Sequence, residues 1–346
     1  MCSLSVALLR HAVGCTSPAT TPSREPAAPR PGPSSAALDA LPAVRDVTLT
    51  VSNLRRSVAF FEHMDFVLDG ERDLAGAPLD ALLHLPNAAE HVARLHLGTE
   101  HVELRQFAVP GRPISGDARN NDATFQHMAV VVSDIDAAFA AVLAAGAERI
   151  SPEPQTIPAS NPAAGGIRAA YFHDADLHDL ELIWFPAGKG RPRWQERHGV
   201  FLGVDHTAIA VARTEPSRGF YESLAFSVGG KSYNFGPEQE ALSGVPGARV
   251  RITSLVPEAG PSIEFLSYEA PKTGRGAPSD SAANDVWRWE VTIEVADLDA
   301  AVAHVMKSGG RPVSSGPVDV GALGLGYAKA VLVEDPDGHA LRLVSR

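Results

Sequence analysis

The stretch HMAVVVSDIDAAFAAVLAAGA, residues 127–147, predicts a strand, a tight turn and a helix in direct succession. Its first residues are mostly apolar and rich in valine, which is typical of a buried strand. Ser133 and Asp134 are residue types that cap the N-terminus of a helix. The apolar side chains that follow, Phe139 and Val142 among them, recur at the spacing of one helical face. This stretch therefore predicts the opening strand and helix of a small mixed unit.

The same pattern opens three other segments of the chain. They are DVTLTVSNLRRSVAFFEHMDF (46–66), HTAIAVARTEPSRGFYESLAF (206–226) and EVTIEVADLDAAVAHVMKSGG (290–310). Each unit closes with a further apolar strand, and these are HVELRQF, LELIWF, SIEFLSY and ALRLVS. The chain between the helix and the closing strand has room for two more strands. Each unit is therefore predicted to be a βαβββ module.

The four modules also repeat in pairs. Asp46 and His206 are 160 positions apart, and His127 and Glu290 are 163 positions apart. This spacing predicts a tandem duplication of a two-module domain. The first predicted domain spans 43–188, with modules 43–110 and 122–188, and the second spans 200–346, with modules 200–270 and 285–346.

Residues 1–42 are rich in proline, alanine and serine and predict a disordered leader. Residues 1–15 are mildly apolar and end in Cys15, similar to a lipoprotein export signal, although the positive first region is missing. The expected location is cytoplasmic, or exported if this stretch acts as a signal. Cys2 and Cys15 are the two cysteines of the chain. Any metal in the body must therefore be held by histidines and carboxylates.

The composition is that of a globular protein, with 45% hydrophobic and 21% charged residues in a chain of 346. Thirty Lys and Arg stand against 41 Asp and Glu, a formal net charge of −11, which argues against nucleic acid as a partner. No run of about 20 apolar residues occurs, so no membrane span is predicted. The expected partner is a small-molecule substrate, and the chain is expected to be a monomer or a homodimer.

The strand–turn–helix openings, together with the ending EDPDGHALRL (334–343), resemble the vicinal oxygen chelate superfamily. That superfamily includes glyoxalase I, methylmalonyl-CoA epimerase, extradiol dioxygenases and the bleomycin and fosfomycin resistance proteins. The resemblance covers residues 44–346. It implies an α+β fold of four βαβββ modules forming two glyoxalase-like domains, in which pairs of modules curve around a cleft.

The resemblance also implies where metal ligands lie in each module. They come from the first residue of the opening strand and from a residue of the closing strand. Module by module these positions hold Asp46 and Glu103, His127 and Glu181, His206 and Glu264, and Glu290 and Arg342. Arg342 departs from the pattern, because a guanidinium cannot bind a cation.

The residues themselves favour a cleft. Glu103, Glu181 and Glu264 each sit between apolar neighbours on a predicted strand. Side chains alternate along a strand, so each carboxylate points either to solvent or into a cleft. A buried carboxylate without a partner costs several kcal/mol. Three glutamates in register with His127 and His206 favour the cleft.

Two pairings of modules stay open, and both use the eight positions above. If neighbouring modules pair, each cleft receives one of the two histidines. If the pairing is exchanged, one cleft collects His127, Glu181, His206 and Glu264. The other cleft then collects Asp46, Glu103, Glu290 and Arg342 as a degenerate site. The exchanged pairing is the preferred prediction, because it gathers a complete ligand set in one place.

Two imidazoles and two carboxylates suit a divalent ion such as Zn, Ni, Co, Mn or Fe(II). Such an ion acts as a Lewis acid on neighbouring substrate oxygens and stabilises an enediolate, with Glu181 or Glu264 as the base. The predicted function is a metal-dependent lyase or isomerase of the glyoxalase type. The alternatives are another metal-dependent enzyme, such as an oxygenase or a biosynthetic tailoring enzyme, and a small-molecule binding or resistance protein without turnover.

Other residues receive weaker predictions. Arg105, Arg249 and Arg251 are candidates for the mouth of a cleft, where they would recognise a charged substrate. Tyr233 and Asn234 are expected on a loop over a cleft. Three histidines in turns before closing strands are expected at the surface, and these are His173, His178 and His339.

Overall fold

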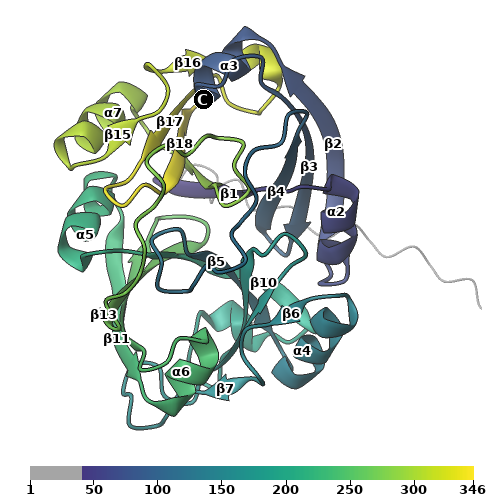
Figure 1. Cartoon of the computed structure of the whole chain (residues 1–346), viewed down its shortest axis with the longest axis vertical. Coiled ribbons are helices and arrows are strands. Elements are labelled where there is room, and N and C mark those ends of the chain that lie inside the picture. Colours follow the sequence, from purple (N-terminus) through teal and green to yellow (C-terminus); the bar gives the residue numbers. More distant parts are fainter. Residues whose placement is uncertain (1–40) are drawn as a thin grey trace, which may run out of the picture. The chain divides into compact units, whose positions relative to one another are not determined.

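The computed structural model of the chain describes residues 41–346, coloured along the sequence in Figure 1. The predicted leader lies outside the described residues, except for its last two positions. The described part contains the four predicted βαβββ modules, arranged in two large mixed sheets. Among residues 41–346, no helix is long and apolar enough to cross a membrane.

The elements follow the predicted order. Module one consists of β1 (Ala43–Thr50), α2 (Leu54–Glu62), β2 (Val67–Ala75), α3 (Ala77–Leu83), β3 (Ala89–Leu97) and β4 (Glu100–Phe107). Module two consists of β5 (Gln126–Val132), α4 (Ile135–Ala144), β6 (Glu148–Arg149), β7 (Gln155–Thr156), β8 (Arg168–His173) and β9 (Asp179–Trp184), followed by the short 3-10 helix η1 (Pro192–Gln195).

Module three consists of β10 (Phe201–Ala210), α5 (Thr214–Ser223), β11 (Ser227–Phe235), α6 (Pro237–Ser243), β12 (Arg249–Val256) and β13 (Ser262–Ala270). Module four consists of β14 (Trp289–Glu294), α7 (Leu298–Lys307), β15 (Arg311–Pro312), β16 (Val318–Asp319), the 3-10 helix η2 (Gly321–Leu323), β17 (Lys329–Glu334) and β18 (Ala340–Ser345). The short helices α3 and α6 were not predicted.

Each sheet joins modules that are not neighbours in the sequence. Sheet A combines modules one and four in the order β15-β17-β18-β14-β1-β4-β3-β2, with β16 on β17. Sheet B combines modules two and three in the order β11-β12-β13-β10-β5-β9-β8-β6, with β7 on β8. The exchanged pairing is therefore confirmed. Each predicted sequence domain, 43–188 and 200–346, contributes one module to each sheet.

Antiparallel seams hold the paired modules together. In sheet A, β1 runs against β14 and places Thr48 opposite Glu290. In sheet B, β10 runs against β5 and places Ala208 opposite His127. The seam strands also pair in parallel with the closing strands, so His127 and the strand that carries Glu181 are direct neighbours. This topology brings opening and closing strands of two modules to the middle of one sheet.

Side-chain caps begin three of the four main helices where the sequence predicts them. The side chains of Asn53, Asp134 and Asp297 accept hydrogen bonds from backbone N–H groups in the first turn of α2, α4 and α7. Such caps satisfy N–H groups that a helix end leaves open. Helix α5 begins after Arg213 without a side-chain cap.

The hydrophobic cores connect the two sheets. Apolar side chains of modules one and two form one core, in which the rings of Phe60 from α2 and Phe172 from β8 lie 6.4 Å apart. Modules three and four form a second core around α5 and α7, with Phe220 and Val305 fully buried. Figure 1 shows α2 and α4 on one side and α5 and α7 on the other. Strand pairing and core packing thus join different pairs of modules.

Two turn histidines correct the sequence analysis. His178 and His339 were predicted at the surface, but both are buried. The Nδ1 atom of His178 lies 2.9 Å from Asp174, and its Nε2 atom lies 3.1 Å from the carbonyl oxygen of Val286 in the other sheet's linker. Burial lowers the pKa of His178, but Asp174 outweighs this and raises it to about 9. His173 is only partly buried.

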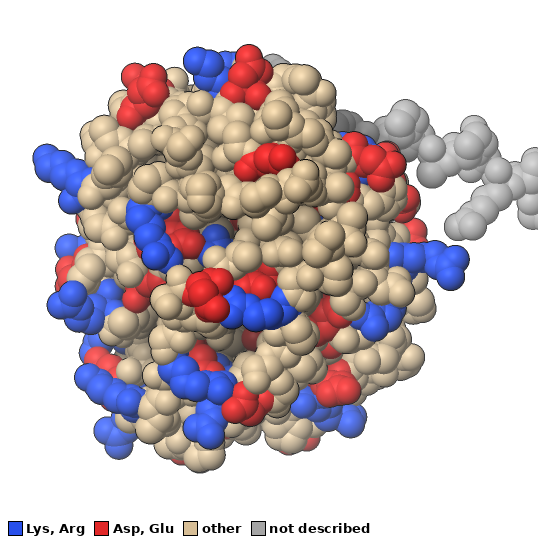
Figure 2. Space-filling model, turned by 45° about the horizontal axis from the view of Figure 1, so that its top comes forward, with Lys and Arg blue, Asp and Glu red and all other residues tan. Residues whose placement is uncertain are grey.

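The linkers that precede β5 and β14 bind each other. Arg112 reaches Asp285 at 2.6 Å, and Arg275 reaches Asp122 at the same distance. Charged side chains of both signs are also mixed across the surface, as Figure 2 shows for one face.

Candidate metal centre

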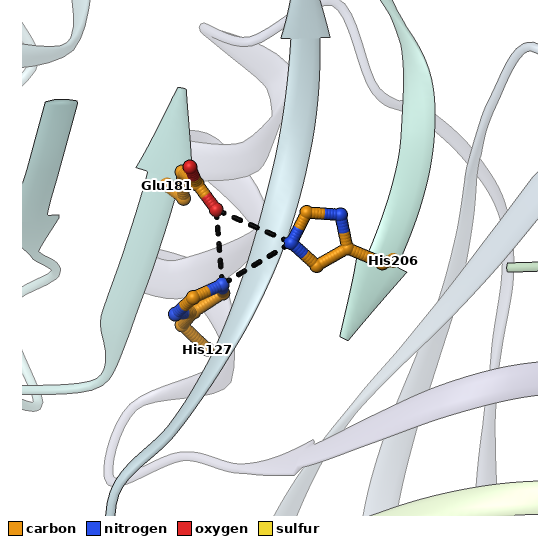
Figure 3. Close-up of side chains that lie close together, drawn as sticks. All are labelled: His127, Glu181 and His206. Atoms are coloured by element: carbon orange, nitrogen blue, oxygen red, sulfur yellow. Dashed lines mark hydrogen bonds and ion pairs between the residues drawn. The ribbon is translucent and has the colours of Figure 1, made fainter. Parts of the chain in front are cut away.

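Four predicted ligands meet at the centre of sheet B. His127 comes from β5, Glu181 from β9, His206 from β10 and Glu264 from β13. The Nε2 atoms of the two histidines lie 3.4 Å apart, and Glu181 Oε2 lies 2.9 Å from that of His127 and 3.3 Å from that of His206. Glu264 Oε2 lies 3.6 Å from His206 Nε2. Figure 3 shows the two rings and the Glu181 carboxylate pointing at one another.

These distances fit the donor shell of a metal ion. Bonds of about 2.0–2.2 Å to nitrogen and oxygen put neighbouring ligands roughly 3.0–3.4 Å apart in octahedral or tetrahedral geometry. The three atoms that the dashed lines in Figure 3 connect have about that spacing. Two imidazoles and two carboxylates also form a donor set that divalent ions prefer.

The charge balance of the cluster also favours binding of a cation. Burial lowers the pKa of His127, which favours the neutral ring that can bind a metal. Burial raises the pKa of Glu181, but hydrogen bonds to both histidines outweigh it and lower the pKa to about 2. Burial also lowers the pKa of His206, but Glu264, Asp205 and Glu181 raise it well above its usual value. Carboxylates thus outnumber the positive charges that the chain itself supplies.

A second layer orients His206. Its Nδ1 atom lies 3.1 Å from Asp205 Oδ2, and the indole of Trp194 donates to Asp205 Oδ1 at 2.6 Å. Metal-binding histidines usually have such a partner on the other ring nitrogen. Sequence analysis missed Asp205 and Trp194, although Asp205 immediately precedes a predicted ligand. The Nδ1 atom of His127 has no hydrogen-bond partner among residues 41–346, and its ring packs on Tyr171 with centroids 4.9 Å apart.

The cluster faces a small cavity of about 130 Å³. Glu181 and Glu264 line it together with both histidines, and the side chain of Glu264 is 22% exposed against 6% for Glu181. Ala164, Ile167, Tyr171 and Phe185 are among the apolar residues of the wall. A ligand in this cavity would therefore meet Glu264 and the open side of the cluster first.

The other four predicted residues meet at the centre of sheet A, but they form ion pairs. Glu290 binds two buried guanidinium groups, Arg105 and Arg342, each at 2.6 Å. Arg94 lies 2.7 Å from Asp46, and Arg72 pairs with Glu103. Arg342 Nη1 also donates to the hydroxyl of Tyr327 at 3.2 Å.

Among the described residues of sheet A, each predicted carboxylate thus has an arginine partner. Burial raises the pKa of Glu290, but Arg105 and Arg342 lower it to about 2. Arg105 is completely buried, so its predicted place at a cleft mouth is wrong. Its side chain reaches across β1, where Nε donates to Thr50 Oγ1 at 3.0 Å, to Glu290 on β14.

The remaining predictions for a cleft mouth have mixed outcomes. Tyr233 and Asn234 lie on strand β11 and not on a loop, and both line a cavity next to the cluster of His127, Glu181 and His206. Arg251 also lines that cavity, but Glu269 holds its guanidinium at 2.6 Å. Arg249 is exposed at the start of β12.

The chain is similar to known proteins in sequence and in fold. A family model described as Glyoxalase/Bleomycin resistance protein/Dioxygenase superfamily matches residues 43–182 and 203–343. A protein of Actinomyces sp named 2-epi-5-epi-valiolone epimerase is 33% identical over 151 residues, which cover 42% of this chain and 81% of that protein.

Two solved structures share the fold over most of the chain. Glyoxalase I from Zea mays has a TM-score of 0.56 at 16% identity, covering 90% of this chain and 95% of its own. A putative dioxygenase from Bacillus subtilis has a TM-score of 0.53 at 11% identity, covering 88% of this chain and 84% of its own. With its two matched segments and its four βαβββ modules, the chain belongs to the glyoxalase, bleomycin resistance protein and dioxygenase superfamily, the vicinal oxygen chelate group that its repeats resemble.

Proposed function

We propose that the protein is a divalent-metal-dependent isomerase, which moves a proton on a carbon atom next to a carbonyl group of a small substrate. A lyase of the glyoxalase type would begin with the same proton transfer and is the second candidate. The observation that carries the proposal is the convergence of His127, Glu181 and His206 on one buried point, with Glu264 Oε2 3.6 Å from His206 Nε2.

In this proposal the chain's residues divide the work. His127, His206 and Glu181 hold the ion, and Asp205 orients His206. A divalent ion bound there supplies Lewis acidity, which stabilises the negative charge of an enediolate on two neighbouring substrate oxygens. The cavity walls keep bulk water away from the reacting carbon.

Glu264 is the proposed base. Its side chain is more exposed to the cavity than that of Glu181, and its carboxylate lies farther from the histidines. Burial raises the pKa of Glu264 above its usual value. A carboxylate with a raised pKa takes and returns a proton near neutral pH more efficiently. Glu181 is held by both histidines and is the less suitable base.

The comparison with the Actinomyces protein favours an isomerase over a lyase, since an epimerase is an isomerase. That relative covers only 42% of this chain, so its substrate is a first compound to test. We therefore propose the reaction class and use that compound only as a reference substrate.

The experiment uses protein loaded separately with Zn, Ni, Co, Mn and Fe(II). The compound in the relative's name is incubated with each form in deuterium oxide, and incorporation of deuterium at carbon is followed by NMR. Metal-dependent incorporation that Glu264→Gln abolishes, with the metal content unchanged, supports the proposal. Consumption of dioxygen during turnover would overturn it in favour of an oxygenase.

A further inference from the structure

Two adjoining cavities lie beside sheet B. The inner cavity contains the metal cluster and has a volume of about 130 Å³, whereas the outer one has about 570 Å³. They share five lining residues, which are Ile157, Ser232, Asn234, Gln239 and Leu242. These shared residues form a neck, so the outer chamber is the entrance to the cluster.

About half of the residues that line the outer chamber are apolar, and apolar atoms make up most of its exposed surface. Its wall includes Pro158, Pro162, Pro237, Tyr233 and Phe235. Phe235, at the end of β11, is 57% exposed. The rings of Tyr233 and Phe235 lie 5.3 Å apart and form a continuous aromatic surface at the end of β11.

The charges of the chamber balance each other. Arg251 lies over the Tyr233 ring at 5.2 Å and is bound by Glu269 at 2.6 Å. Lys231 and Glu238 are the other charged residues of the wall, one of each sign. A substrate with several negative charges would need an excess of basic residues here. The wall therefore fits an uncharged apolar group.

Sheet A carries different residues at the positions of the aromatic pair and of Ala164. The strand registers match Tyr233 with Asp73 and Phe235 with Ala75. Leu325 precedes β17 by the same number of residues by which Ala164 precedes β8, and Leu325 is buried against α3 in a local core. The aromatic pair at the end of β11 is thus particular to sheet B, and Ala164, which lines the inner cavity, has a larger counterpart in sheet A.

The neck carries hydrogen-bonding side chains between the two cavities. Asn234 and Gln239 are buried there. The Nδ2 atom of Asn161 donates to the Oδ1 atom of Asn234 at 2.8 Å, which leaves the amide nitrogen of Asn234 to donate to a ligand. Asn161 comes from module two and Asn234 from module three, so this contact positions the neck across the module boundary.

We propose that the substrate has two parts: neighbouring oxygens that reach the metal cluster, and an uncharged aromatic or alkyl body that occupies the outer chamber. This rests on the proposed function for the oxygen-bearing part. Ligand pockets usually measure about 300–1,000 Å³. The inner cavity alone falls below that range, and the outer chamber lies within it. The apolar body therefore supplies most of the binding surface.

The test uses acetohydroxamate and octanohydroxamate, which present the same two neighbouring oxygens on a short and a long apolar chain. Binding to the metal-loaded protein is measured by calorimetry. Each fully buried methylene tightens binding by about fourfold, so burial of about three of the six additional methylenes makes the octano compound bind at least about 30-fold more tightly. Equal affinities of the two compounds would overturn the proposal while leaving the metal centre intact.

Two exposed apolar residues of β11 provide matched variants. Phe235→Ser removes a chamber wall and is expected to reduce the advantage of the long chain at least about threefold, the value of roughly one methylene. Val228→Ser, on the same strand, changes a side chain outside the chamber and is expected to leave the advantage unchanged. Equal effects of the two variants would contradict a specific role for the chamber.

A fluorescence titration separates this proposal from the metal centre. The uncharged dye prodan is added to metal-free protein, where the outer chamber is expected to bind it. Loss of dye binding in Phe235→Ser, with binding kept in Val228→Ser, supports the outer chamber as an apolar binding site. This result holds even if neither hydroxamate binds, an outcome that would contradict the proposed function alone. If metal-free protein shows no saturable binding of the dye, the proposed chamber is wrong.

Discussion

Sheets A and B have the same strand arrangement, but the buried charged residues at their centres are neutralised in different ways. In sheet B, His127, Glu181, His206 and Glu264 converge with an excess of carboxylates, an arrangement that suits an external cation. In sheet A, Glu290 occupies the position of His127 and Arg342 that of Glu181, and the cation is a guanidinium of the chain itself.

The difference continues outward from the two centres. Tyr327 and Leu325 stand beside Arg342 and α3 in sheet A, where sheet B has Gly166 and Ala164. Small residues leave a cavity at one centre, and large ones fill the other. The comparison teaches that a shared strand register determines where charges meet, while residue size and sign determine whether a ligand can enter.

The largest expected effect tests the centre of sheet B. His127→Ala or His206→Ala is expected to abolish tight binding of a divalent metal, because a direct ligand is lost and the carboxylates repel each other. Metal content per chain is measured by elemental analysis. Glu290→Ala, at the equivalent position of sheet A, is expected to keep the metal. Full metal content in both histidine variants would contradict the site.

The second prediction concerns the stability of sheet A. Glu290→Gln removes the negative charge between Arg105 and Arg342 and leaves two buried guanidinium groups without it. Breaking a buried pair in this way costs about 3–5 kcal/mol in the free energy of unfolding. Chemical denaturation measures the loss. The exposed change Glu215→Gln, which breaks a surface pair with Arg218, is the control and is expected to cost at most about 1 kcal/mol.

The third prediction uses a feature that the sheets share, a buried histidine in the turn before the closing strand. The folded-state pKa of His178 is raised to about 9, above an unfolded value of about 6.5. Its stabilisation is therefore fully present below pH 6.5 and is lost as the pH rises through 9. The loss amounts to up to about 3 kcal/mol.

Unfolding free energies of wild type and His178→Gln, measured from pH 6 to pH 10, test this. The difference between the two proteins is expected to shrink as the pH rises. A difference that stays constant over this range would show that the raised pKa of His178 does not contribute. His339, whose pKa is also raised beside Asp335, provides the matched position in sheet A.

The smallest expected effect makes sheet B resemble sheet A at one position. Ala164→Leu introduces the side chain that Leu325 contributes to sheet A and partly fills the inner cavity. Acetohydroxamate is expected to bind about tenfold more weakly, about 1.4 kcal/mol, because the space beside the metal shrinks. Elemental analysis is expected to show unchanged metal content. Unchanged hydroxamate affinity would mean that Ala164 does not limit the cavity.

Much of the fold could be predicted from local patterns. Alternating apolar residues and the caps Asn53, Asp134 and Asp297 act within a few residues, so the opening strands and helices are visible in the sequence. The short helices α3 and α6 escaped prediction because only seven residues form each one. Their burial depends on neighbours in other modules.

The candidate site was predictable in its members and not in its surroundings. His127, Glu181, His206 and Glu264 stand out because period-two alternation marks them as polar residues among apolar ones. Asp205 and Trp194 show no such signal, since their importance arises from the hydrogen bond between them and from the contact of Asp205 with the His206 ring. The buried state of His178 depends in the same way on a carbonyl of the other sheet's linker.

The sequence by itself determined the four modules and the positions at which their charged residues lie. Only the tertiary structure decided which modules share a sheet, because the edges of β1, β5, β10 and β14 offer similar hydrogen-bonding groups to any partner. The antiparallel seams, β1 with β14 and β5 with β10, make this choice, whereas side-chain packing joins modules one and two and modules three and four, and no local pattern records either. The tertiary structure also decided that one centre keeps an open cavity and that the other is closed by its own arginines.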